Sequence, residues 1–154
     1  MMRVILLLSS FAWARPPIPT PTQAVNMVVD TWHEAASKAD EATYFKLFAP
    51  DAVFLGTDGT ERWPVAEFRK YAHQRFATGK GWTITPKARR VSFSPDGKVA
   101  WFDEDVVNAK WGPSRGSGVL VQIDGLWKIA QYNYSVPIPN DLLPKVVDMI
   151  RAAK

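Results

Sequence analysis

The 154-residue sequence contains no cysteine. This absence excludes a disulfide framework, a thiolate metal site, a cysteine nucleophile and a lipid-anchored lipoprotein cysteine. The sequence has no HExxH motif, no glycine-rich phosphate loop and no GxSxG motif. It has only two histidines, His33 and His73, and we expect His73 on an outer helix face. A two-histidine, one-carboxylate site needs both in one cavity, so we expect neither a metal nor another cofactor.

The excess of basic over acidic residues is also small. Lys and Arg number 19 against 15 Asp and Glu, which gives a formal net charge of +4, and no run of four basic residues occurs. We therefore expect no nucleic-acid partner. The 47% hydrophobic content excludes a disordered chain, and the length suits one compact domain.

Residues 1–14 have the plan of a signal peptide. Arg3 precedes an uncharged, mostly apolar run, and Ala12-Trp13-Ala14 matches the small-x-small cleavage rule. The run is shorter than the roughly 20 apolar residues that span a bilayer, so we expect no integral membrane segment in the mature chain. We predict cleavage after Ala14, export to the periplasm or medium, a proline-rich spacer over 15–21, and a folded domain over 22–154. The alternative is a buried N-terminal helix or strand.

Helical periodicity begins at residue 22. Apolar side chains recur every three or four positions, and Thr22 is the expected N-cap. Asp40 should cap a second, short helix that Pro50 ends, and Pro64 should open a third that ends near residue 79. Between the last two we expect a strand over 52–55 and a turn in which Gly59 has positive φ. The first stripe is Val25, Val28, Val29, Trp32 and Ala36.

The second half of the chain alternates in the manner of strands. Pro86 should bend the first of them, and Asp124-Gly125 should form a two-residue hairpin turn. A closing helix follows, with Asn140 or Asp141 as its cap. Helices first and an antiparallel sheet afterwards indicate an α+β fold. The predicted strands are 82–93, 99–108, 115–123 and 126–135.

Several motifs carry a family resemblance. They are Gly56-Thr57-Asp58 with Glu61-Arg62-Trp63, Ala100 to Glu104, Arg115 to Leu120, and Ile138 to Asp141. With the order of elements, the chain resembles the nuclear-transport-factor-2-like superfamily, in its SnoaL-like branch, over residues 22–152. The resemblance implies a cone-shaped α+β fold in which N-terminal helices pack on a strongly curved, mostly antiparallel sheet. It also implies a cavity inside the cone and a homodimer.

Strand alternation predicts which side chains enter that cavity. In the last strand Lys128 belongs in water, so we expect Gln131 and Asn133 to point inward and to orient a ligand or satisfy each other. Tyr132 and Tyr134 then point outward and motivate the homodimer interface.

Three consecutive carboxylates, Asp103, Glu104 and Asp105, lie in one strand, so at least one points inward. A desolvated carboxylate there would have a raised pKa and could act as a general base; the alternative is an ion pair or an edge protected by charge. The catalytic candidates are Asp103, Glu104 and Asp58. The alternative for Asp58 is that it caps its own turn.

Five further residues, together with Gln131 and Asn133, complete the candidate ligand-binding set. His33 could shuttle a proton, or it is a half-buried helix histidine. We expect Arg115 to pair with Glu104 near the cavity rim, with the hairpin centred between Trp111 and Gly112 and Glu104 opposite Val119. The other three lie in the motifs that carry the resemblance: Trp63, Trp101 and Ser117.

Two functions remain open. One is an exported domain that binds a small, largely apolar ligand in the cone cavity. The alternative is an enzyme of the isomerase, cyclase or dehydratase type that transfers a proton on a small carbonyl compound. A carboxylate with a raised pKa in a closed apolar pocket would favour the enzyme.

Overall fold

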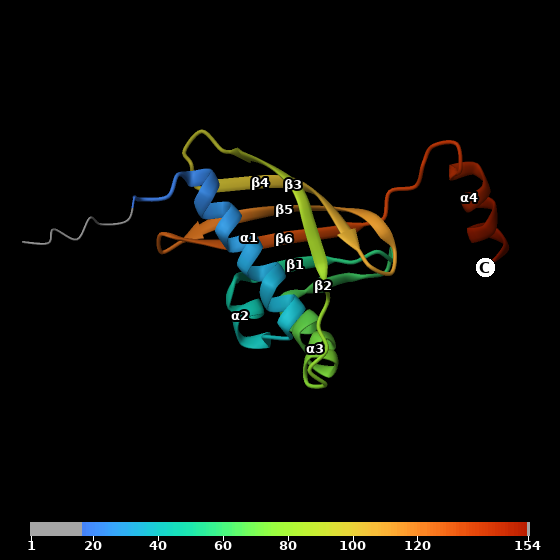
Figure 1. Ribbon diagram of the computed structural model, residues 1–154, viewed down its shortest axis with the longest axis horizontal. Coiled ribbons are helices and arrows are strands. Elements are labelled where there is room, and N and C mark those ends of the chain that lie inside the picture. Colours follow the sequence, from blue (N-terminus) through green and yellow to red (C-terminus); the bar gives the residue numbers. More distant parts are fainter. Residues whose placement is uncertain (1–16, 154) are drawn as a thin grey trace, which may run out of the picture.

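The structure is a computed structural model that describes residues 17–153 (Figure 1). The expected signal peptide and its cleavage site lie outside the described residues. The elements are α1 (Pro21–Lys38), α2 (Glu41–Lys46), β1 (Phe48–Leu55), β2 (Arg62–Pro64), α3 (Val65–Phe76), β3 (Ile84–Phe93), β4 (Val99–Asn108), β5 (Gly112–Ile123), β6 (Leu126–Ser135) and α4 (Leu143–Ala152).

The sheet has six strands in the order β2-β1-β6-β5-β4-β3. All neighbours are antiparallel except β1 and β6, which are parallel. The long helix α1 crosses the sheet and packs against β3 and β6, while α2 and α3 close the other end (Figure 1). The architecture is therefore the predicted curved α+β sheet with N-terminal helices on its inner face.

The helices begin and end slightly differently from the prediction. The N-cap of α1 is Thr20, not Thr22: its hydroxyl accepts a hydrogen bond from the Gln23 backbone N–H, and the Gln23 side chain accepts one from the Thr20 N–H. This capping box places Pro21 at the first helical position, where its missing N–H costs nothing. Asp40 caps α2 as predicted. Pro50 ends no helix, because α2 stops at Lys46 and Pro50 lies in β1.

Most strands match their predicted ranges, and the bounds of β4 and β6 match them at both ends. Asp124 and Gly125 both have positive φ, as a two-residue hairpin turn requires, and the register of β3 shifts beside Pro86. Two expectations were wrong and one strand was missed. Gly59 does not have positive φ, the three-residue strand β2 was not foreseen, and no side chain caps α4, whose N-cap residue is Leu142.

A β-bulge reverses the faces of β6. Val119 pairs with Gln131 while Leu120 pairs with Ile129, so Ala130 is an extra residue with no partner on β5. Trp127 and Ile129 point inward as predicted, but beyond the bulge Tyr132 is the buried residue and Gln131 is exposed. The inward assignment of Gln131 and Asn133 was therefore wrong.

The bulge also removes the surface that motivated the homodimer. Tyr132 is 0% exposed and Tyr134 is 5% exposed, so neither aromatic ring is available to a partner. Both rings instead pack within the cone, where Tyr132 lies against Trp32 and Tyr134 lies against Trp111.

The hairpin between β4 and β5 is centred on Lys110, because Asn108 pairs with Gly112. This register places Glu104 opposite Gly116, not opposite Val119, and places Arg115 opposite Asp105 on the outer face. The predicted pair between Arg115 and Glu104 was wrong, since a strand register error of an odd number of residues exchanges the two faces of the sheet.

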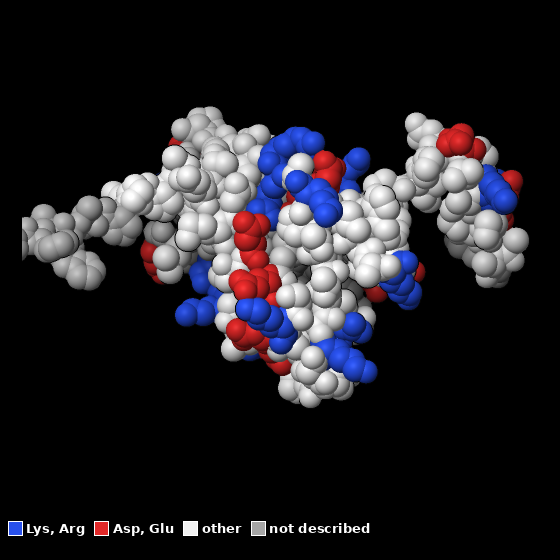
Figure 2. Space-filling view, viewed as in Figure 1, with Lys and Arg blue, Asp and Glu red and all other residues white. Residues whose placement is uncertain are grey.

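The last helix stands apart from the rest of the chain. None of the residues of α4 is buried, and Figure 1 shows the helix beyond the end of the sheet. Among the described residues, no helix is both long and apolar enough to cross a membrane. Basic and acidic side chains are interspersed on the face shown in Figure 2.

Candidate functional site

Glu104 is the centre of a buried polar cluster under α1. Its side chain is 0% exposed, and β4 points it inward between Phe102 and Val106. Oε1 lies 2.7 Å from His33 Nε2 and accepts a hydrogen bond of 2.9 Å from the hydroxyl of Tyr132. Helix α1 supplies His33 and strand β6 supplies Tyr132, so the carboxylate joins three elements.

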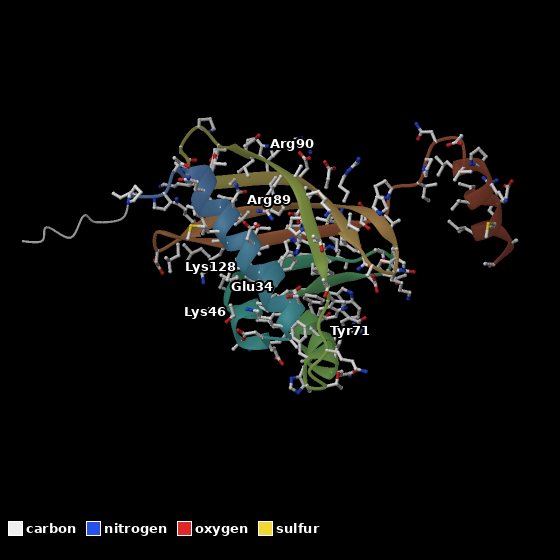
Figure 3. The ribbon with its side chains drawn as sticks, viewed as in Figure 1. Glu34, Lys46, Tyr71, Arg89, Arg90 and Lys128 are labelled. Atoms are coloured by element: carbon white, nitrogen blue, oxygen red, sulfur yellow. The ribbon has the colours of Figure 1, made fainter. Side chains whose placement is uncertain are left out.

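Arg89 of β3 holds the second carboxylate oxygen. Its Nε donates to Glu104 Oε2 at 2.9 Å, and Nη2 lies 2.8 Å from the same oxygen, an ion-pair contact without the alignment of a hydrogen bond. Nη1 donates to Asp30 Oδ1 at 2.8 Å and to Asn26 on α1. Arg89 is only 6% exposed, and its position close to α1 can be followed in Figure 3.

The partners of Glu104 keep it ionised. Burial raises the pKa of Glu104, but the hydrogen bond and charge of His33 and the charge and hydrogen bond of Arg89 outweigh burial and hold the pKa below its ordinary value. Burial, together with the charge of Glu104, raises the pKa of the Tyr132 hydroxyl well above its ordinary value. Glu104 is therefore a structural anion with filled hydrogen-bonding sites, not a general base with a raised pKa.

Gly116 makes room for this cluster. A Cβ at that position would lie 2.3 Å from the Tyr132 hydroxyl and 2.8 Å from Glu104 Oε1. Two positions along β5, a Cβ at Gly118 would lie 2.8 Å from the Phe102 ring. The glycines therefore admit the inward side chains of the neighbouring strands.

A cavity of about 500 Å³ opens beside the cluster. Its wall includes many aromatic side chains and combines the end of α1, one face of α3, and the loops that follow β1 and β4. Three ionisable side chains, Glu61, Arg75 and Lys110, line it together with His33. The aromatic residues of the wall are Trp32, Tyr44, Phe54, Trp63, Phe68, Tyr71, Trp82, Trp111 and Tyr134.

Two of the predicted ligand-binding residues line this cavity. His33 is 4% exposed, so it is buried, not half-buried as expected, and its ring stands 5.0 Å from that of Trp32. Trp63 lies on β2 and stacks on Tyr71 of α3, which is labelled in Figure 3. Glu104 does not line the cavity itself, but it contacts His33, which does.

The remaining predicted residues lie elsewhere. Asp58 caps its own turn, accepting hydrogen bonds from the backbone N–H and hydroxyl of Thr60, which lower the pKa of Asp58. The alternation of β4 and β5 and the bulge of β6 place the others on the outer or solvent-exposed side, away from the cavity, so the sheet does not bring them to the site. They are Asp103, Trp101, Arg115, Ser117, Gln131 and Asn133.

Two buried nitrogen atoms of residues that line the cavity have no hydrogen-bond partner within the described chain. They are Nε1 of Trp32 and Nδ1 of His33. Buried polar atoms are normally paired, so each unpaired one needs an explanation.

The second histidine is not part of a metal site in the described chain. His73 lies on the exposed face of α3 and pairs with Glu41. Among residues 17–153, no group of three His, Asp or Glu side chains is arranged to hold a metal ion.

Sequence reasoning missed Arg89 and Tyr132. A signal for Arg89 was present, because alternation along β3 puts it on the same face as Val91 and Phe93, which are half-buried. No comparable signal existed for Tyr132, since its direction depends on the bulge at Ala130.

Comparison with known proteins agrees with this architecture. A crystal structure of an uncharacterised protein with a cystatin-like fold from Caulobacter vibrioides has a TM-score of 0.65 at 14% identity and covers 81% of this chain and 94% of its own. A candidate scytalone dehydratase from Novosphingobium aromaticivorans has a TM-score of 0.65 at 12% identity, over 76% of this chain and 84% of its own. These likenesses establish the fold.

A candidate aromatic ring hydroxylase from the same organism has a TM-score of 0.64 at 20% identity and covers 81% of this chain and 94% of its own. Among curated proteins, none matches this chain. The family model of the SnoaL-like domain matches residues 25–139, which include most of α1, the whole sheet and the cavity. The chain therefore belongs to the SnoaL-like domain family and has the nuclear-transport-factor-2-like fold.

Proposed function

We propose that this SnoaL-like domain binds a small, largely apolar ligand in the cavity between α1, α3 and the sheet. The observation that carries the proposal is the cavity of about 500 Å³ with nine aromatic side chains in its wall. Concave sites of this size, apolar apart from a few polar groups, are typical of small-molecule binding. The aromatic rings favour a flat, unsaturated molecule, because they offer faces for stacking.

The electrostatics favour binding over carboxylate catalysis. The only buried carboxylate in the described chain, Glu104, has a lowered pKa and all its partners in place. A general base near neutral pH would need a raised pKa and access to the substrate. Neither condition holds for Glu104.

Titration with naphthalene tests the proposal, with the fluorescence of the cavity tryptophans as readout. We expect saturable quenching in the wild type and weaker binding in Ala36→Leu, because Ala36 lines the cavity and a larger side chain fills it. Met27→Leu on the same helix is the matched control, since Met27 is 61% exposed and lies outside the cavity wall. Equal binding by both variants and the wild type would contradict the proposal.

A second candidate function is proton transfer on a small carbonyl compound, with His33 as the base. One observation favours it: His33 lines the cavity, and Glu104 behind it accepts from Nε2, an arrangement that fixes the orientation of the imidazole. Exchange of an α-deuteron of 2-tetralone, followed by NMR, tests this function. A rate that is the same in wild type and His33→Gln would exclude it.

We further propose that the mature protein is exported after cleavage following Ala14 and forms a homodimer. The small-x-small triplet before the prolines supports cleavage. Trp101, 48% exposed on the outer face of β4, supports an interface there. An intact mass that includes Met1 would contradict the first, and a monomer in light scattering would contradict the second.

A further inference from the structure

Two cationic side chains line the cavity without an acidic partner in the described chain. Arg75 of α3 and Lys110 of the β4–β5 hairpin belong to the wall, and neither forms an ion pair with a carboxylate of residues 17–153. Glu61 is the one carboxylate of the wall, and its Oε2 accepts a hydrogen bond from the Asp58 backbone N–H. Lys and Arg therefore outnumber Asp and Glu in the wall.

The guanidinium group of Arg75 is held at the wall. Its Nε and Nη2 both donate to the carbonyl oxygen of Gly81, at 3.0 and 2.9 Å. The guanidinium carbon stands 5.5 Å from the centroid of the Trp82 ring. Gly81 and Trp82 themselves line the cavity. The charged end of Arg75, and not only its methylene stem, is therefore placed beside the cavity.

This anchoring leaves one edge of the guanidinium group free. A guanidinium has five N–H donors in a planar fork. The Gly81 carbonyl takes the N–H of Nε and one N–H of Nη2, so one N–H of Nη2 and both of Nη1 have no acceptor in the described chain. Two parallel N–H groups of this kind bind a carboxylate bidentately. Arg75 is an exposed residue, so a ligand can reach the edge.

Aromatic rings surround the same part of the wall. Tyr71 precedes Arg75 by one turn of α3 and is labelled in Figure 3. The Tyr71 and Trp82 rings are nearly parallel, with an interplanar angle of 15° and centroids 6.4 Å apart, and both residues line the cavity. Tyr71 is 48% exposed. A flat ring can therefore pack against the surface that carries the guanidinium group.

We propose that Arg75 binds the carboxylate of an aromatic acid whose ring packs against the aromatic side chains of the cavity. The two carboxylate oxygens accept hydrogen bonds from Nη1 and Nη2 of Arg75. Lys110, whose Nζ stands 5.3 Å from the centroid of the Trp111 ring, adds positive charge to the wall. This inference rests on the proposed binding function and names its ligand class.

The size of the selection follows from the exposure of the site. Hydrogen bonds between ionised groups are about twice as strong as neutral ones, and a bidentate pair adds geometric specificity. Solvent and salt screen a charge that is exposed, as Arg75 is. We therefore expect a carboxylate to bind about tenfold more tightly than its neutral amide, and this preference should decrease as the salt concentration rises.

Isothermal titration calorimetry with 2-naphthoate and 2-naphthamide at pH 7 tests the selection, because the two probes have nearly the same shape. The wild type should prefer 2-naphthoate about tenfold. Arg75→Met should remove the preference and change the affinity for 2-naphthamide less than twofold. Arg75→Lys keeps the charge without the planar fork, so it should keep only part of the preference.

Lys80→Met is the matched control. Lys80 precedes Gly81 in the same loop, is exposed and is not part of the cavity wall, so this variant removes an equal charge close to the site. It should keep the preference for 2-naphthoate. An equal loss of preference in Lys80→Met and Arg75→Met would overturn the role of Arg75, and so would a parallel loss of affinity for both probes in Arg75→Met.

The outcomes separate the two proposals. Equal binding of 2-naphthoate and 2-naphthamide by the wild type would overturn the carboxylate selection and leave the binding function standing. Binding of neither probe, nor of naphthalene, would overturn both. If Arg75→Met fails to fold, Arg75→Lys decides the inference, since an undiminished preference in that variant would contradict bidentate binding.

Discussion

The two faces of β3 and β4 carry the same chemistry in opposite environments. On the inner face Arg89 binds Glu104, and these side chains are 6% and 0% exposed. On the outer face Arg90 binds Asp103 and Asp105, and these three side chains are 52–62% exposed. Figure 3 labels both arginines, one beside α1 and the other at the outer edge of the sheet.

The difference teaches how burial changes the role of a salt bridge. On the outer face water already solvates each charge, so the pairs add little stability and any member can be lost. On the inner face each charge has lost its water, and removal of one partner leaves the other buried and unpaired. The inner cluster therefore determines the geometry of the cavity wall, and the outer one leaves the site unaffected.

The largest effect is expected for Arg89→Met. The substitution keeps much of the side chain's volume but leaves Glu104 with His33 and Tyr132 as its only partners. We expect a loss of about 3–5 kcal/mol in the free energy of unfolding at pH 7, measured by urea denaturation. A loss below about 1 kcal/mol would show that the inner cluster behaves like a surface pair.

The second-largest effect is expected at acid pH, which should weaken the inner cluster. The pKa of Glu104 is lowered in the folded protein, so its ionised form stabilises the fold at every pH above the ordinary value of 4.5 and this contribution is lost as the pH falls toward the folded pKa. The difference in melting temperature between wild type and Glu104→Gln should be constant from pH 7 to about pH 5 and shrink below that. A difference that grows on acidification would contradict the assignment.

A smaller loss is expected for Gly116→Ala. The added methyl group would overlap the Tyr132 hydroxyl and Glu104 Oε1, and both of these side chains are fully buried. Overpacking of this kind costs about 1–3 kcal/mol. Gly59→Ala is the matched control, because nothing lies within 4 Å of a Cβ there and the backbone φ is not positive. Similar melting temperatures for the two variants would show that the cluster is loosely packed.

The smallest effect is expected for Arg90→Met. Arg90 bonds only the exposed Asp103 and Asp105, and solvent replaces it there. We expect urea denaturation to show no measurable change in stability, and naphthalene affinity to equal that of the wild type. A loss similar to that of Arg89→Met would remove the distinction between the two faces.

The sequence by itself determined the order of the elements and the class of the fold. Apolar side chains at three- and four-residue spacing place α1, and Asp40 and the Asp124-Gly125 turn mark boundaries through their local backbone chemistry. Strand alternation puts Phe102, Glu104 and Val106 on one face of β4, and the structure buries all three. These features depend on near neighbours in the chain, so the pattern contains them.

The tertiary structure alone decided which polar side chains meet. One extra residue at Ala130 exchanged Gln131 for Tyr132 on the inner face, and the position of the hairpin at Lys110 exchanged Arg115 for Gly116 as the neighbour of Glu104. Side-chain direction in a strand alternates with every residue, so a single bulge or an odd register shift reverses it. The bulge and the register both depend on pairing between strands that are distant in the sequence, and local periodicity contains no information about that pairing.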